Sequence, residues 1–240
     1  MRVWPADSGC LENGSVKIEG PDARHIATVL RCGVGDTLKV GDGKSRVFKA
    51  RIETVNKNLV VARITGRASI IRDKKPEVTL AMSICKQSVM ELAVQKAVEL
   101  GCKEVLPVIT RRSFAEKISA AKLARLSRIA HEASKQCGRC SAMAVSEPMA
   151  TGQIPSAGLR LVLWEEEKKR DVKSVLLNSG KPATVLLLVG PPGGFHHDEM
   201  KGFIQNGFQP ARLGGFILKS ETAAISLLAI VNYHFGKMDS

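Results

Sequence analysis

The rhythm of hydrophobic and polar residues changes near residue 70, and the change predicts two structural regions. Before it, short apolar segments alternate with turns rich in Gly, Asp and Asn, which is typical of β-strands. After it, apolar runs of strand length alternate with longer segments of helical spacing, which predicts a parallel sheet flanked by helices. The charged segment 70–76 ends in proline and is predicted to link a first domain, residues 1–72, to a second, residues 73–240.

The first region is predicted to be a small β-barrel, because it combines several short strands with one helix. The predicted strands cover residues 16–18, 37–40, 46–52 and 59–64, and the predicted helix covers 21–31. On the helix, Ile26, Val29 and Leu30 have the spacing of residues that face a core. On the third strand, strict alternation puts Lys49 and Arg51 on the face opposite its apolar residues.

The second region is predicted to be an α/β domain with a doubly wound, mostly parallel sheet. Strands are predicted over residues 78–84, 104–109, 159–164 and 184–189. Helices are predicted over 89–100, 120–136, 172–178, 197–205 and 221–235, and Gly101 is placed to end the first of them. The last helix is apolar nearly all round, so it must be buried on two sides. A partner subunit or a wholly internal position would each satisfy that requirement.

Two glycine-rich loops follow predicted strands near the C-terminus. The apolar run 185–189 leads into Gly190-Pro-Pro-Gly-Gly-Phe195, and a second short strand leads into Gly214 and Gly215 before a helix that begins at Ser220. Paired loops at the carboxyl ends of parallel strands are where α/β proteins bind ligands, although each loop alone also reads as an ordinary turn. The first loop lacks the G-x-G-x-x-G spacing and a Walker lysine, which argues against a nicotinamide-dependent Rossmann enzyme.

The charge of the chain points to a polyanionic partner. It has 36 Lys and Arg against 23 Asp and Glu, a net charge of +13 and a pI of about 9.7, which suits nucleic acid first and an anionic membrane second. No apolar run approaches membrane-spanning length, and the six cysteines are scattered, so we expect a cytoplasmic protein with reduced thiols and no membrane association. Cys137 and Cys140 have metal-ligand spacing but no second pair, so no metal is expected.

Motifs along most of the chain resemble those of one enzyme family. They are Gly190-Pro-Pro-Gly-Gly-Phe195, Arg212-Leu-Gly-Gly-Phe-Ile-Leu-Lys-Ser-Glu-Thr-Ala223, Gln95-Lys-Ala-Val-Glu-Leu-Gly101, Arg111-Arg-Ser113 and Glu132-Ala-Ser-Lys-Gln-Cys-Gly-Arg139. The pattern is similar to that of the SPOUT methyltransferases, and more narrowly of the RsmE-type enzymes, which methylate N3 of a uridine in 16S ribosomal RNA. The resemblance implies a C-terminal trefoil knot that holds S-adenosylmethionine and an N-terminal PUA-like RNA-binding barrel.

The resemblance also implies which residues hold the cofactor. The two loops would supply apolar walls, backbone groups that lie close to the cofactor, and the start of a helix. The residues concerned are Leu188, Val189, Gly190, Gly193, Gly194, Leu213, Gly214, Ile217, Leu218, Ser220 and Glu221. Glycines allow a ligand to approach the backbone closely. Ser220 is placed as an N-cap and Glu221 in the first turn, where the helix dipole favours a carboxylate. A helix start alone would explain these last two residues equally well.

The acceptor nitrogen must lose a proton before it can attack the methyl group. Positive charge near the uridine oxygens would stabilise the resulting anion, and Arg111, Arg112 and Lys219 are candidates by analogy. No single residue stands out as the general base, and His131 is expected to be packed or exposed rather than catalytic.

RNA binding is predicted for basic residues of the first domain. The segment from His25 to Arg31 is similar to a motif of the family's RNA-binding domain, and Arg24, Lys49 and Arg51 would join it in contacting phosphates. A solvated strand face is the alternative for any one of them. The expected partner is 16S ribosomal RNA or the small ribosomal subunit.

Three residues depart from the family pattern. Pro192 stands where a glutamate is usual, Lys219 replaces an arginine, and His196 replaces a serine and should weaken a helix cap. The missing carboxylate leaves open a non-catalytic ribosomal RNA-binding or assembly factor that retains the fold. SPOUT enzymes pair through the knotted region, so the resemblance also implies a homodimer.

Overall fold

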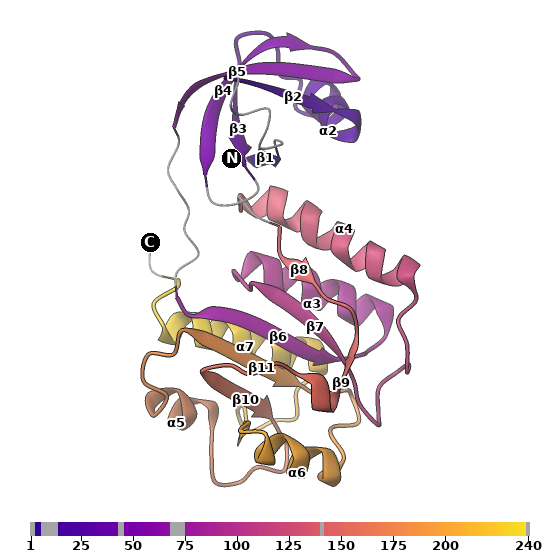
Figure 1. Cartoon of the computed structure of the whole chain (residues 1–240), viewed down its shortest axis with the longest axis vertical. Helices are drawn as coiled ribbons and strands as arrows, with labels where there is room; N and C mark the ends of the chain where they lie inside the picture. The colour runs from indigo at the N-terminus through magenta and orange to yellow at the C-terminus, as the bar shows by residue number, and fades with distance from the viewer. Residues whose placement is uncertain (1–2, 6–13, 43–45, 68–74, 140–141, 239–240) are drawn as a thin grey trace. The chain divides into compact units, whose positions relative to one another are not determined.

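The computed structural model describes residues 3–5, 14–42, 46–67, 75–139 and 142–238 (Figure 1). Its contacts divide the chain into two compact units. The first comprises Met1–Arg72 with His131–Ala142, and the second comprises Asp73–Ala130 with Met143–Ser240. Most of the predicted linker, including the boundary between residues 72 and 73, lies outside the described residues.

The first unit is built on a five-stranded sheet. Its strands are β1 (Val3–Pro5), β2 (Ser15–Glu19), β3 (Thr37–Gly41), β4 (Val47–Val55) and β5 (Leu59–Arg67), in the order β1-β3-β4-β5-β2. Only the β1–β3 pair is parallel. The four predicted strands are thus confirmed, and no β1–β2 pairing that would close a barrel occurs among the described residues. Along β4, alternation buries Ala50 and Ile52 and exposes Lys49 and Arg51, as predicted.

The helical segment of this unit differs from the prediction. α2 (Gly20–Arg24) continues into the π-helical turn η1 (His25–Val29), in which the Leu30 N–H bonds to the His25 carbonyl. Ile26 is buried in the core as expected, but Val29 is 64% exposed and Leu30 46% exposed. The prediction that all three face the core is therefore wrong. A π-turn holds more residues than an α-turn, so residues three and four positions after Ile26 rotate off its face.

The second unit contains an all-parallel sheet, so the α/β class with a parallel sheet is confirmed. The strands are β6 (Glu77–Ser83), β7 (Glu104–Ile109), β8 (Ala144–Val145), β9 (Met149–Ala150), β10 (Leu159–Leu163), β11 (Thr184–Val189) and β12 (Gln209–Ala211). The sheet order is β12-β10-β11-β6-β7-β8, and β9 also pairs with β7. β11 lies between β10 and β6 with five consecutive buried residues, which explains its unbroken apolar run.

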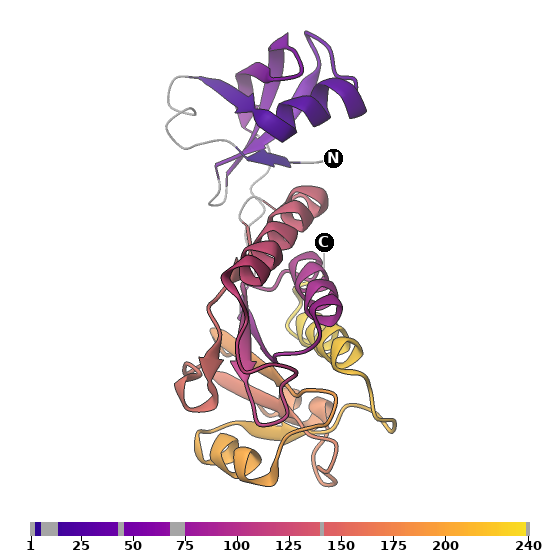
Figure 2. The ribbon, with the colours of Figure 1, turned by 90° about the vertical axis from the view of Figure 1, so that its right-hand side faces the viewer.

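Helices cover both faces of this sheet. α3 (Gln87–Glu99) and α7 (Ser220–His234) pack together on one face, and α6 (His197–Gln205) lies on the other (Figure 2). The remaining helices are α4 (Ala120–Cys137), α5 (Val172–Leu177) and the short 3₁₀ turn η2 (Thr151–Gln153). Gly101 has φ +70° and ends α3, as predicted. In the part of the chain that the structure describes, no helix has the length and apolar character needed to cross a membrane.

Candidate functional site

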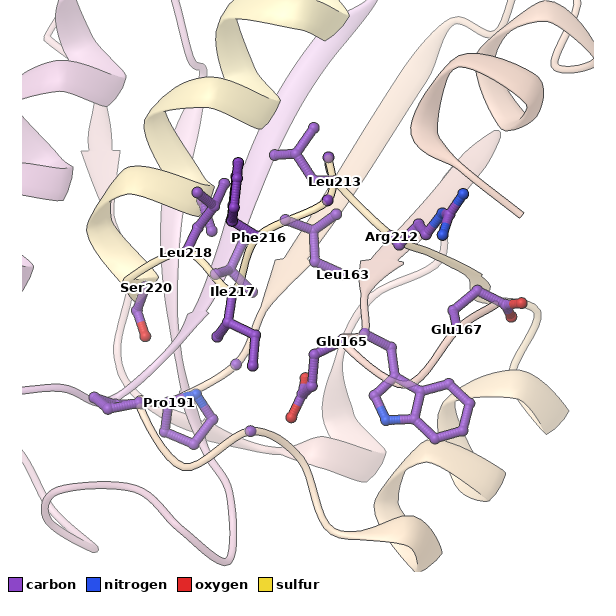
Figure 3. Close-up of a pocket in the computed structure, with 18 of the residues that line it drawn as sticks. Leu163, Glu165, Glu167, Pro191, Arg212, Leu213, Phe216, Ile217, Leu218 and Ser220 are labelled. Carbon is purple, nitrogen blue, oxygen red and sulfur yellow. The ribbon is translucent and has the colours of Figure 1, made fainter. Parts of the chain in front are cut away.

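Three neighbouring strands of the parallel sheet end at one pocket. β10, β11 and β12 run parallel, so the loops after Leu163, Val189 and Ala211 emerge at the same edge. These loops and the start of α7 enclose a cavity of about 240 Å³ (Figure 3). A cavity at the carboxyl edge of a parallel sheet is the usual ligand site of this architecture.

Most of the predicted cofactor residues line this pocket. Those that do are Val189, Gly190, Gly194, Leu213, Gly214, Ile217, Leu218 and Ser220. Leu188 instead lies in the buried core of the sheet. Gly193 is exposed on the loop, and Glu221 is half-buried in the first turn of α7.

Sequence reasoning missed the third wall of the pocket. It comes from the last residue of β10 and the loop that follows, and it contains Leu163, Trp164, Glu165, Glu167 and Lys168. These residues match no motif, but they lie at the carboxyl end of a predicted strand or just after it. Had the strand order been known, the position of β10 beside β11 would have identified them.

Gly194 is the most constrained residue of the glycine loop. It has φ +69°, its N–H donates to the Pro191 carbonyl at 2.8 Å, and a Cβ built on it would lie 1.9 Å from Glu165 Oε1. A side chain at this position is therefore disfavoured both by the backbone conformation and by the neighbouring carboxylate. At Gly190, a Cβ would come within 3.0 Å of the Phe195 ring. Glycine is therefore the residue that fits both positions without strain.

The polar groups of the pocket can be compared with those of S-adenosylmethionine, which combines an adenine, a sulfonium cation and an amino-acid end. Leu213, Ile217 and Leu218 offer apolar surface to a heterocycle. The Glu165 carboxylate brings negative charge into the pocket and extends towards Pro191 of the glycine loop (Figure 3). Among the described residues, the buried indole Nε1 of Trp164 has no hydrogen-bond partner, which leaves a donor for a ligand acceptor. The residues present therefore fit this cofactor.

The start of α7 differs from the prediction in one respect. Lys219 occupies the N-cap position without a side-chain cap bond, and Ser220 is the first helical residue, 5% exposed. The prediction that Ser220 caps the helix is therefore wrong, because the extended backbone ends one residue earlier. The Ser220 hydroxyl instead interacts with the Cys85 thiol, whose pKa burial raises to about 11.

The predicted catalytic arginines lie beside the pocket rather than in its lining. The Arg112 guanidinium donates to the Gly193 carbonyl, which ties it to the glycine loop. Arg111 Nη1 lies 2.9 Å from His196 Nδ1 and 3.2 Å from Asp198 Oδ2. Lys219 is exposed next to α7, and His131 is exposed on α4.

His196 acts as the N-cap of α6 despite replacing a more usual cap residue. Its Nδ1 accepts from the Asp198 N–H at 3.3 Å, and Glu199 Oε2 accepts from the His196 N–H at 3.0 Å. The loop therefore still passes into a capped helix.

The first unit presents a basic sheet face. Lys39 is directly opposite Lys49 in the β3–β4 pair, and Arg51 is directly opposite Arg63 in the β4–β5 pair. Glu53 on the same face pairs with Arg63 at 2.5 Å, but the four cations outnumber this carboxylate, and like charges directly opposite one another are unfavourable, so the face suits a polyanion. Lys39 and Arg63 were not predicted, because strand register is needed to place them beside Lys49 and Arg51.

The other predicted RNA-binding residues belong to the helical segment. Arg24 is exposed on α2. His25 is half-buried, its ring 5.7 Å from that of Trp4. Arg31 is exposed just after η1, with a positive φ of 53°.

Comparisons with known proteins cover both units. A family model described as an RNA methyltransferase domain matches residues 73–232, and one described as an RNA methyltransferase PUA domain matches residues 18–65. The ribosomal RNA small subunit methyltransferase E of Synechocystis sp. is 31% identical, over 91% of this chain and 73% of the relative. The ribosomal RNA small subunit methyltransferase E of Rickettsia conorii is 29% identical, over 94% of this chain and 92% of the relative.

Solved structures show the same fold. A Legionella pneumophila methyltransferase in complex with S-adenosylmethionine is 30% identical with a TM-score of 0.81, covering 96% of this chain and 93% of that one. The Neisseria gonorrhoeae ribosomal RNA small subunit methyltransferase E, bound to S-adenosylmethionine, has a TM-score of 0.85 at 24% identity and covers 97% of each chain.

Proposed function

The chain belongs to the RNA methyltransferase family, and we propose that it is an S-adenosylmethionine-dependent enzyme that methylates N3 of a uridine in 16S ribosomal RNA. The observation that carries the proposal is the pocket at the carboxyl ends of β10, β11 and β12. Its shape depends on Gly190 and Gly194, where side chains would collide with neighbouring atoms. Relatives matched over most of this chain are named ribosomal RNA small subunit methyltransferases.

The pocket would bind and orient the cofactor, which supplies an electrophilic methyl group on sulfur when bound. Leu213, Ile217 and Leu218 would hold the adenine by apolar contact, and the Trp164 indole N–H would donate to a ligand acceptor. Glu165 would face the positive charge of the cofactor. We further propose that the two glycine loops belong to a trefoil knot, as in the SPOUT enzymes that the chain resembles.

Two arginines would stabilise the negative charge that the uridine ring acquires when N3 loses its proton. Arg112 is held against the glycine loop by its bond to the Gly193 carbonyl, so its charge stays at the mouth of the pocket. Arg111 is oriented by His196, the N-cap of α6, and by Asp198 in the first turn of that helix. Lys219, at the start of α7, would add a third positive charge. Fixed charges of this kind favour the ionised nucleophile over the neutral base.

The basic face of the first unit would bind the RNA backbone. Lys39, Lys49, Arg51 and Arg63 supply positive charge from three adjacent strands, and Arg24, His25 and Arg31 would add contacts from the helical segment. The partner would be 16S ribosomal RNA or the small ribosomal subunit, in the cytoplasm. The match of residues 18–65 to a PUA domain model supports this role.

We also propose a homodimer. Phe216 is 89% exposed and Ile217 is 87% exposed in the loop before α7, and Ile230 and Tyr233 are exposed on α7 itself. Large apolar side chains that are exposed in one region mark interaction surfaces. A second copy packed against this region would cover them and complete the site.

Calorimetric titration with S-adenosylmethionine tests the proposal against its rival. An enzyme binds the cofactor at micromolar concentrations, whereas a non-catalytic assembly factor binds ribosomal RNA but not the cofactor. The exposed Pro192, where the family pattern has a glutamate, is the observation that favours the rival. RNA binding without cofactor binding would therefore overturn the methyltransferase assignment.

A further inference from the structure

The turn that carries the two arginines is rigidly fixed to the sheet. The Thr110 N–H donates to Ser113 Oγ at 2.9 Å, and the Ser113 N–H donates to the Thr110 carbonyl at 3.0 Å. The Thr110 hydroxyl donates to Ser83 Oγ at 3.2 Å, at the end of β6. The Phe114 N–H donates to the Ile84 carbonyl at 2.8 Å. Residues 110–114 are therefore held in one conformation across the ends of two neighbouring strands.

This rigid turn holds an aromatic ring in solvent. Phe114 is 60% exposed, whereas three of the seven phenylalanines are buried and two are half-buried. The ammonium of Lys86 lies 6.0 Å from the centroid of the ring. The ring also lines a hollow with Arg111 and Lys117. An exposed ring with cations around it has the character of a surface for an aromatic, negatively charged ligand.

The acidic groups of the same hollow are largely engaged. Asp198 pairs with Arg111, and Glu199 accepts from the backbone N–H groups of Arg111 and His196. Glu116 is the further carboxylate of the lining. Lys86 and Lys117 are exposed and can meet phosphates.

The ring is also close in the fold to the proposed chemistry. Arg112, two residues before Phe114, bonds to the glycine loop of the pocket. Cys85, next to Lys86, interacts with Ser220 at the pocket wall. Phe114 therefore stands on the same edge of the sheet as the pocket.

We propose that Phe114 is a stacking platform for a nucleobase of the RNA substrate, an inference that rests on the proposed function. N3 of a paired uridine is engaged in its base pair, so a uridine must leave the stack before N3 can react. A base taken out of the stack loses its neighbours, and an aromatic ring replaces them. Lys86 and Lys117 hold the adjoining phosphates, while Arg111 and Arg112 face the reacting base.

The test compares three substitutions at one position. Phe114→Ala removes the ring, Phe114→Leu keeps apolar bulk without it, and Phe114→Trp enlarges it. Affinity for small-subunit ribosomal RNA should fall about 5- to 150-fold in the Ala variant, the range that losing one base–aromatic stack gives. The Leu variant should fall nearly as far, and the Trp variant should bind as tightly as the wild type. Cofactor affinity should stay unchanged in all three.

Ultraviolet cross-linking of the wild type gives an independent readout. Mass spectrometry should find a uridine attached to the peptide that contains Phe114. Unchanged RNA affinity in the Ala variant, or affinity in the Leu variant equal to that of the wild type, would overturn the stacking role. If the wild type binds RNA through Phe114 but fails to bind S-adenosylmethionine, the methyltransferase proposal fails while the stacking surface stands.

Discussion

Replacing Gly194 by alanine should separate backbone strain from loss of the cofactor site. At φ +69°, any L-residue is disfavoured by about 1–2 kcal/mol, which corresponds to a fall in melting temperature of about 2–8 °C. In addition, the new Cβ would stand 1.9 Å from Glu165 Oε1. Glu165 is an exposed, flexible side chain and can turn away, so the collision displaces its carboxylate from the pocket rather than unfolding the protein.

The expected effect on binding follows from that displacement. An interaction with a charged group contributes about 1.5–3 kcal/mol, so losing the Glu165 contact should weaken S-adenosylmethionine binding about 10- to 150-fold. Gly207→Ala is the matched control, because Gly207 has φ +81°, no atom within 4 Å of a built Cβ, and no place in the pocket lining. It should lose similar thermal stability and keep wild-type affinity.

Calorimetric titration with S-adenosylmethionine gives the cofactor affinity of both variants, and thermal melts give their stability. Equal cofactor affinity in Gly194→Ala and Gly207→Ala would refute the assignment of this loop. Glu165→Gln provides a second check, because it removes the charge without altering the backbone. It should reproduce most of the affinity loss with no fall in melting temperature.

Three further predictions test other parts of the account. Charge reversal at Lys49 and Arg51 should weaken RNA binding and flatten its dependence on salt, while reversal at Lys173 leaves both unchanged; filter binding at several salt concentrations measures this. The Asp171 carboxylate caps α5 by accepting from the Ser174 N–H at 2.7 Å, and this bond lowers its pKa. The stabilisation that this bond gives α5 is fully present at pH values above the ordinary pKa of a carboxyl group, and it is lost as the pH falls through the lowered pKa. Asp171→Asn should therefore keep the cap near neutral pH and, unlike the wild type, should also keep it in thermal melts at acid pH. Mixing the Lys49/Arg51 variant with Gly194→Val should restore part of the methyl transfer through heterodimers, and a light-scattering mass near 25.9 kDa would argue against the dimer.

The elements that sequence predicted well are those determined by local pattern. The apolar run of β11 follows from burial of the strand on both faces, and the alternation on β4 follows from burial of one face only. The helix at residues 20–29 was harder, because no local signal shows that its second half is a π-turn that exposes Val29. The Ser220 cap was wrong by one position, because the extended backbone ends at Lys219.

The part of the site that sequence did not predict depends on how strands are ordered. Trp164 and Glu165 belong to no motif, and they reach the pocket because β10 lies between β11 and β12. Likewise, Arg51 lies opposite Arg63 because of the register of β4 and β5. Strand order and register follow from contacts between segments far apart in the chain, and the spacing of residues within one segment does not encode them.

Methyl transfer to the small ribosomal subunit is the decisive assay for the proposed activity. Small subunits that lack the modification would be incubated with the protein and S-adenosylmethionine carrying an isotopically labelled methyl group, and the RNA then digested and resolved by mass spectrometry. We expect one labelled nucleoside, N3-methyluridine, from 16S ribosomal RNA, and a strongly reduced yield with Gly194→Ala. A label on another atom or base, or no transfer by a protein that binds both RNA and cofactor, would contradict it.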